Sequence, residues 1–191
     1  MSRDLNKLSK EIYENNKAKG FHEEKHSLEH MMCLVISELM EAVEAYRRNS
    51  KVDYSYEEDG LAYTIMEDNE FKDWYECTTK GSVEDELADA VIRLLDTAGA
   101  LGVSSEINRS EASGVLNYIT KWGFNIQSFT ESIYSIIRVF ILSTFSVGYR
   151  IANMIANIEF LCEVMDVDLW QHVELKNKYN NLRPYKHGNK Y

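Results

Sequence analysis

Four acidic residues occur as two pairs with the same spacing. Glu38 and Glu41 form one pair, and Glu86 and Asp89 form the other. Residues three apart point from the same side of an α-helix, so each pair would present two carboxylates together. Both pairs lie in apolar stretches of sequence rather than on fully polar faces. If the two helices pack, all four carboxylates converge beside the core.

A group of carboxylates of this kind favours a bound cation. Two like charges about 4 Å apart repel by about 4 kcal/mol at an effective dielectric constant of about 20. Either some of the acids hold protons or a cation neutralises them. Carboxylate oxygens suit hard ions, so Mg²⁺ is the ion that we expect and Mn²⁺ is the alternative. The opposing interpretation is that both pairs are solvated, because this spacing is common on exposed helices.

The acids next to the two pairs are expected to play other parts. Glu84 and Asp85 are expected to face solvent. Asp96 lies two turns beyond Asp89 on the same helix face, where it is either a further metal ligand or a partner of Arg93.

Three histidines, His22, His26 and His30, precede and begin the helix that carries the first acid pair. A di-iron bundle needs two Glu-x-x-His motifs on its helices, and only Glu23 and His26 form one here. A zinc site would need closer Cys or His partners. We therefore expect solvated histidines, and a di-metal redox bundle is the weakest of the functional alternatives.

The elements that would carry these residues are helical. Only one of the 191 residues is proline, Pro184, and 45% are hydrophobic, so a helical core can form. Apolar periodicity predicts helices at about residues 5–19, 27–48, 82–101, 126–144, 149–165 and 168–182. Ser27 and Ser82 are the predicted N-caps of the two acid-bearing helices. We expect one all-α domain over residues 1–191, with insertions at about 49–80 and 105–165, the first of them a loop or an ordered segment without clear periodicity.

The composition argues against several classes of partner. Acids outnumber bases by 31 to 21, and the formal charge of -10 would repel a nucleic acid polymer. The most apolar stretch has an uncharged run of 11 residues between Arg138 and Arg150, whereas a membrane span needs about 20. Three cysteines without metal-binding spacing fit a reducing compartment. Since the first residues lack the apolar core of a signal peptide, a cytoplasmic location is expected.

The C-terminal segment is basic, in contrast to the rest of the chain. Arginine and lysine can hold phosphate oxygens, and asparagine and tyrosine can hydrogen-bond a base or a sugar. The opposing interpretation is a frayed, solubilising tail. The cations that follow Glu174, the last acid, are Lys176, Lys178, Arg183, Lys186 and Lys190.

In combination, these motifs resemble the MazG-like branch of the all-alpha nucleoside triphosphate pyrophosphohydrolases. The pattern of that family is ExxE on one helix, ExxD on the next, and a C-terminal signature KxxxNxxRxxxHG. The resemblance covers roughly residues 5–48, 82–104 and 165–191. The matching residues are Glu38, Glu41, Glu86 and Asp89, followed by Lys176, Asn180, Arg183, His187 and Gly188.

The resemblance implies a four-helix-bundle core, with the extra helices inserted before the C-terminal segment, in a homodimer or homotetramer. It implies Mg²⁺-dependent hydrolysis of a nucleoside triphosphate between the alpha and beta phosphates, which gives a nucleoside monophosphate and pyrophosphate. The alternative is a non-catalytic helical module that binds a nucleotide or a partner protein. The implied metal-binding and catalytic residues are Glu38, Glu41, Glu86 and Asp89, one of which alternatively orients the water, and the implied substrate-binding residues are Lys176, Tyr179, Asn180, Arg183, Lys186 and His187.

Overall fold

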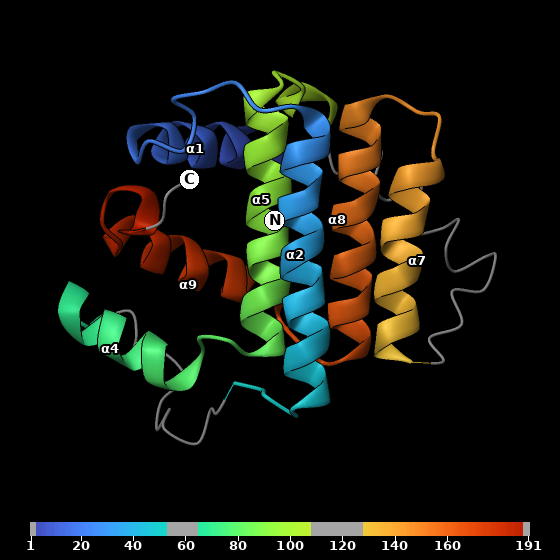
Figure 1. Cartoon of the computed structure of the whole chain (residues 1–191). Helices are drawn as coiled ribbons and strands as arrows, with labels where there is room; N and C mark the ends of the chain where they lie inside the picture. The colour runs from blue at the N-terminus through green and yellow to red at the C-terminus, as the bar shows by residue number, and fades with distance from the viewer. Residues whose placement is uncertain (1–2, 53–64, 108–127, 189–191) are drawn as a thin grey trace.

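The computed structural model describes residues 3–52, 65–107 and 128–188, with side chains as far as residue 186. These residues form seven α-helices, two short 3-10 helices and no strand, which confirms the predicted all-α class (Figure 1). Both predicted insertions, 49–80 and 105–165, lie partly outside the described residues. The helices are α1 (Leu5–Ala18), α2 (Leu28–Arg47), α4 (Asp68–Thr78), α5 (Val83–Ala100), α7 (Phe129–Leu142), α8 (Val147–Val164) and α9 (Leu169–Leu182), with 3-10 turns at Ser104–Glu106 and Tyr185–Gly188.

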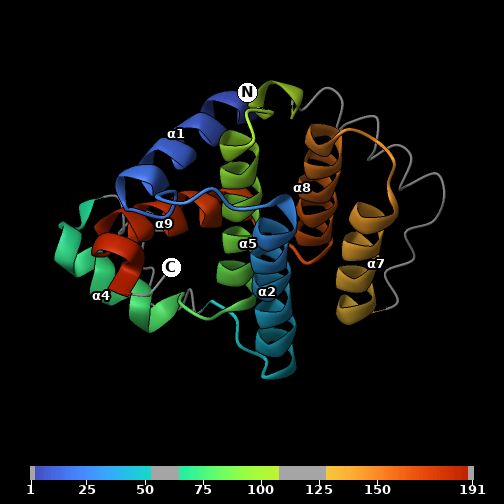
Figure 2. The ribbon, with the colours of Figure 1, turned by 45° about the horizontal axis from the view of Figure 1, so that its top comes forward.

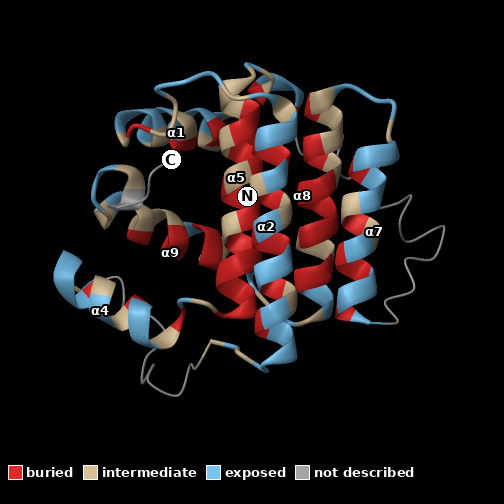
Figure 3. Cartoon of the chain, in the orientation of Figure 1, coloured by how far each residue is buried: buried red, intermediate tan, exposed pale blue. Residues whose placement is uncertain are grey.

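Helix α5 is the centre of the packing. It contacts α1, α2, α8 and α9, so almost every side of it is covered. Leu87, Val91, Leu94 and Leu95 have no exposed surface, and the helix is buried along most of its length in Figure 3. Because so much of its surface is covered, acids of its first turn such as Asp85 and Glu86 are buried along with its apolar residues. By contrast, α2 keeps one exposed face and packs the other against α5.

Local capping fixes where the two acid-bearing helices begin. The hydroxyl of Ser27 accepts the N–H of His30 at 3.2 Å, and that of Ser82 accepts the N–H of Asp85 at 3.1 Å. Both predicted N-caps are therefore confirmed. Ser50 ties the end of α2 to the start of α5, because its carbonyl accepts the N–H of Val83 at 3.0 Å. The two helices run side by side in opposite directions (Figures 1 and 2).

The second half of the first insertion is a helix that the hydropathy pattern missed. Helix α4 begins with a capping box between Glu67 and Glu70. Its buried residues Phe71 and Tyr75 are four apart and so lie on one face. They pack against Leu175, Tyr179 and Leu182 of α9 in a small cluster beside the main core. The exposed remainder of α4 hides this face in a hydropathy pattern.

Helices α7 and α8 extend the main core. Helix α8 contacts α5, and α7 contacts both α2 and α8. Ile133 and Ile136 of α7 and Ile151 and Ile155 of α8 belong to the same buried cluster as the residues of α5. The described part of the second insertion is thus packed into the fold. Among the described residues, no helix is both long and apolar enough to cross a membrane.

Candidate metal and phosphate site

Three of the four predicted acids come together between α2 and α5. One carboxylate oxygen from each of Glu38, Glu41 and Glu86 lies within 4.8 Å of the other two. Glu38 and Glu86 are buried, whereas Glu41 is exposed at the edge of the group. The antiparallel pairing explains this arrangement, since it places the second half of α2 against the first half of α5. The donor set consists of oxygen atoms alone, which suits a hard divalent cation.

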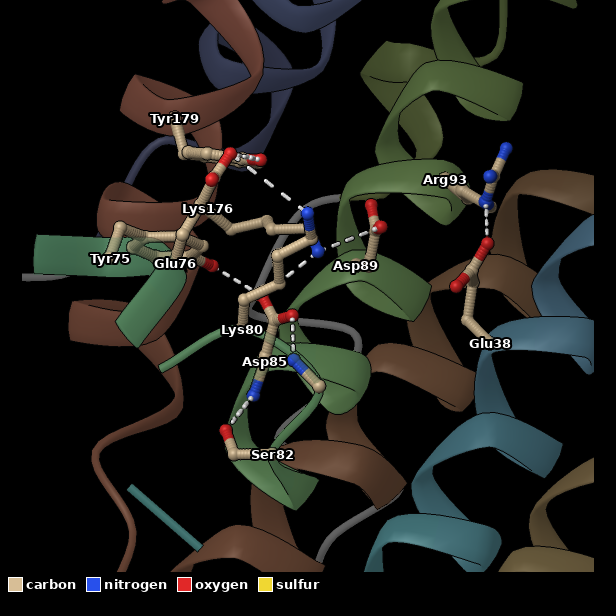
Figure 4. Close-up of polar contacts among 11 residues, drawn as sticks. Glu38, Tyr75, Glu76, Lys80, Ser82, Asp85, Asp89, Arg93, Lys176 and Tyr179 are labelled. Carbon is tan, nitrogen blue, oxygen red and sulfur yellow. Dashed lines mark hydrogen bonds and ion pairs between the residues drawn. The ribbon is translucent and has the colours of Figure 1, made fainter. Parts of the chain in front are cut away.

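The fourth predicted acid, Asp89, is held by a lysine. The Nζ of Lys176 lies 3.1 Å from Oδ2 of Asp89 and 2.9 Å from Oδ1 of Asp85 (Figure 4). Lys176 comes from α9 and only 5% of its surface is exposed. A buried ammonium between two carboxylates satisfies charges that would otherwise be costly to bury. The carboxylate of Asp89 therefore lies beside the acid group already paired with the ammonium of Lys176.

A second cation lies on the other side of the acids. Nε of Arg93 donates to Oε1 of Glu38 at 2.5 Å. One alternative from the sequence paired Arg93 with Asp96, but Asp96 binds His22, whose Nε2 lies 2.9 and 3.0 Å from its two carboxylate oxygens. His22 is mostly buried, so the expectation of a solvated histidine is wrong there.

The environment separates the proton affinities of these acids. Burial, together with the neighbouring Asp85, raises the pKa of Glu86 to about 8. Burial and the charge of Asp89 also raise the pKa of Glu38, against the opposing effect of Arg93. Burial alone would raise the pKa of Asp89, but Lys176 and Arg93 hold it below its ordinary value. Without a bound ion, Glu86 is therefore protonated and Asp89 ionised at neutral pH.

Asp85 and Glu84 are buried, so the prediction that they face solvent is wrong. Asp85 is 1% exposed and accepts hydrogen bonds from the hydroxyl of Tyr75 and from the N–H of Gly81, the latter at 2.9 Å. Glu84 accepts the N–H of Val52 at 3.2 Å. Segments distant in sequence cover the first turn of α5, and a local pattern contains no sign of that cover.

A cleft of about 180 Å³ opens beside Asp89, whereas Glu38, Glu41 and Glu86 do not line it. Asp89 and Arg93 of α5 and Asn180 and Arg183 from the C-terminal part of the chain line it on one side. The side-chain oxygen of Asn180 is buried, and none of the described residues donates a hydrogen bond to it. A buried acceptor of this kind is costly unless a ligand or water supplies the donor. His22 and His26 of the joint before α2 and His30 of its first turn also line the cleft, together with Phe21, Met31, Leu34 and Ile92.

The residues of the basic C-terminal signature have different positions. Lys176, Asn180 and Arg183 reach the site. Lys176 and Asn180 are four residues apart and so share one side of α9, and Arg183 is the residue that ends this helix. Tyr179 is buried and stacks on Tyr75 with ring centroids 4.5 Å apart. Lys186 does not line the cleft.

Two further residues of the C-terminal segment were predicted to bind substrate. Nζ of Lys186 lies 2.6 Å from Oε2 of Glu23, and this ion pair holds the segment after α9 against the joint after α1. The side chain of His187 lies outside the described residues.

Comparison of the chain with protein-family models, with curated proteins and with solved structures finds no match in any of the three. The resemblance to the pyrophosphohydrolases thus stays a prediction from the motifs. A proposal for the function depends on the geometry of the acids, the cations and the cleft.

Proposed function

We propose that the chain is a Mg²⁺-dependent nucleoside triphosphate pyrophosphohydrolase, with Mn²⁺ as the alternative ion. It hydrolyses its substrate between the alpha and beta phosphates and releases a nucleoside monophosphate and pyrophosphate. The observation that carries this proposal is the gathering of Glu38, Glu41 and Glu86 from two helices. Arg93, which binds Glu38, lines a cleft together with Asp89 and Arg183. Carboxylates for a metal and cations for phosphate are the two requirements of this chemistry.

The chemistry of the acids supports a divalent ion. Two buried carboxyls with raised pKa values lack sufficient positive charge around them. Glu38, Glu41 and Glu86 are the residues that would hold the ion, and Asp89 would join them from the next turn of α5. A bound ion would neutralise phosphate charge and lower the pKa of an attacking water.

The cations and the cleft would bind the rest of the substrate. Arg183 lines the cleft near Asp89, and its charge acts on that carboxylate. A guanidinium in this position can grip two phosphate oxygens, whereas the ammonium of Lys176 adds a point charge. The buried side-chain oxygen of Asn180 would accept an N–H or O–H of the nucleoside. The rings of His26 and His30 line the cleft and stack on each other with centroids 4.4 Å apart, and they offer a surface on which a nucleobase can stack.

The decisive experiment measures pyrophosphate release from a panel of normal and modified nucleoside triphosphates, with and without Mg²⁺. The test variant is Glu38→Gln, and the matched control is Glu44→Gln, an exposed acid on the same helix. Release that needs Mg²⁺, survives in the control and is lost in the test variant would establish the activity. Release of orthophosphate would show that a different phosphoanhydride bond is broken. No release from any triphosphate would refute the proposal.

One observation favours the alternative of a non-catalytic binding module. Arg93 already pairs with Glu38, and Lys176 with Asp89, without any metal. A site balanced in this way could bind a nucleotide through its cations alone. Calorimetry separates the two functions, because the module would bind nucleotide equally well with EDTA and would tolerate Glu86→Gln.

Assembly and location are part of the same proposal. Tyr134, Ile141 and Leu142 of α7 are 65%, 61% and 70% exposed, and such an apolar face supports a homodimer or homotetramer. Light scattering coupled to gel filtration measures the subunit number. The three cysteines form no disulfide, which supports a cytoplasmic location.

A further inference from the structure

We propose that Asp85 and Tyr75 are positioning residues, which hold the ammonium of Lys176 at the edge of the acid group and keep Asp89 available to a metal ion. The inference rests on the proposed function of the same site. It assigns a role to a carboxylate outside both acid pairs and to a helix of the first insertion.

The first step is the shared position of Lys176. Its Nζ is almost equally distant from Asp85, at 2.9 Å, and from Asp89, at 3.1 Å. A lysine whose only partner was Asp89 would compete with a cation for that carboxylate. Since Asp85 is a second partner, Lys176 keeps a counter-ion when the carboxylate of Asp89 coordinates a metal ion. The ammonium then stays beside the site, where a phosphate oxygen can meet it.

The second step is the rigidity of Asp85. Its Oδ2 accepts the N–H of Gly81 at 2.9 Å, and its Oδ1 accepts the hydroxyl of Tyr75 as well as Lys176. Both carboxylate oxygens are thereby fixed, and Figure 4 shows these contacts converging on the first turn of α5. An anchor held in this way cannot follow the lysine toward Asp89.

The third step is the rigidity of Tyr75. Its side chain has no exposed surface, and its ring stacks on that of Tyr179 with centroids 4.5 Å apart. Phe71 packs beside it in the same cluster between α4 and α9. The connection therefore runs from α4 through Tyr75, Asp85 and Lys176 to the acid group. Outer partners of this kind orient the inner ligands of metal sites, and their loss weakens metal binding.

The test measures Mn²⁺ binding to the whole protein by electron paramagnetic resonance, which needs no turnover. Asp85→Asn should weaken Mn²⁺ binding by about 10-fold, within the range seen for outer partners of metal ligands. Tyr75→Phe keeps the packing and removes one hydrogen bond, so it should weaken binding by a smaller factor. Asp73→Asn, on the exposed face of α4, is the matched control and should leave binding unchanged.

The combination with Lys176→Met distinguishes positioning from a structural role. Without the lysine there is no competitor for Asp89, so Asp85→Asn should have no effect on Mn²⁺ affinity in the Lys176→Met background. The KM for a triphosphate should rise in the Tyr75→Phe variant, whereas Lys176→Arg should recover part of the activity that Lys176→Met loses.

Two results would overturn the inference. Equal effects of Asp85→Asn in both backgrounds would show that this aspartate acts independently of the lysine. Unchanged Mn²⁺ affinity in both Asp85→Asn and Tyr75→Phe, with a normal response to Glu38→Gln, would show that the acid group works without this support. If the unaltered protein binds no Mn²⁺, the proposed function fails as well, and the two failures are thus distinguishable.

Discussion

Replacing Glu86 by glutamine should stabilise the protein in the absence of metal, and increasingly so as the pH rises. The ordinary pKa of this carboxyl is 4.5, and burial beside Asp85 raises it to about 8 in the folded protein. Between these values the folded state holds a proton that the unfolded state has lost. The resulting stabilisation is complete below the lower value and is lost as the pH rises through the upper one.

The size of the effect follows from that one proton. A difference of one bound proton changes the free energy of unfolding by about 1.4 kcal/mol for each pH unit. Glutamine has no proton to lose, so the Glu86→Gln variant should gain this amount per unit relative to the unaltered protein. In a chain of this length about 1 kcal/mol shifts Tm by about 2–4 °C. The gap in Tm should thus widen by about 3–5 °C per pH unit.

Circular dichroism measures this gap in Tm by following thermal unfolding in EDTA. The pH should be varied between about 5.5 and 7.5, which lies between the pKa values of Glu86 in the unfolded and the folded protein. Glu44→Gln, which replaces an exposed acid on α2, is the matched control, and its gap in Tm should not widen in this way. A gap that stays constant or narrows for Glu86→Gln would refute the assignment of a buried, protonated carboxyl beside the other acids.

Three further predictions concern the metal, the buried lysine and the core. Mg²⁺ at about 100 times its Kd should stabilise the protein by about 2.7 kcal/mol, and a fixed Mg²⁺ concentration should raise Tm more at higher pH, where the carboxyls lose their protons more readily. Glu38→Gln should abolish this shift in Tm, and an unchanged shift would exclude metal binding there. Lys176→Met should cost about 3–5 kcal/mol in urea unfolding, since two carboxylates lose their cation, whereas the exposed Lys10→Met should cost under about 0.5 kcal/mol; equal costs would contradict the ion pairs. Leu94→Ala should cost about 2–5 kcal/mol in the same assay, far more than Leu142→Ala on the exposed face of α7; similar costs would contradict the central position of α5.

The helices could be predicted from the sequence where their signals are local. The second predicted helix ran from 27 to 48 and is observed at Leu28–Arg47, and the last ran from 168 to 182 and is observed at Leu169–Leu182. A side-chain cap begins each of them, Ser27 for α2 and Asp168 for α9, and α2 also has a clear apolar period. Helix α4 was missed because its buried face consists of only two residues, and its stability comes from contact with α9.

The candidate site was only partly predictable. The spacing of the acid pairs correctly indicated that two helices would bring carboxylates together, and three of the four do so. The same spacing did not indicate that Lys176 would form an ion pair with Asp89, or that Arg93 would form one with Glu38. Asp85 illustrates the limit most clearly, because it stands beside a motif acid in sequence, was expected in solvent, and is almost completely buried.

The sequence by itself determined the helical class, the caps, and which carboxylates share a helix face. These properties depend on hydrogen bonds and side-chain positions within a few residues. Tertiary structure alone decided which acids receive a cation, which of them stay protonated, and which residues line the cleft. Charges interact through space, and their strength depends on burial. Residues from α4, α5 and α9 that are far apart in sequence meet around Lys176, and only the packing of those helices sets the distances between them.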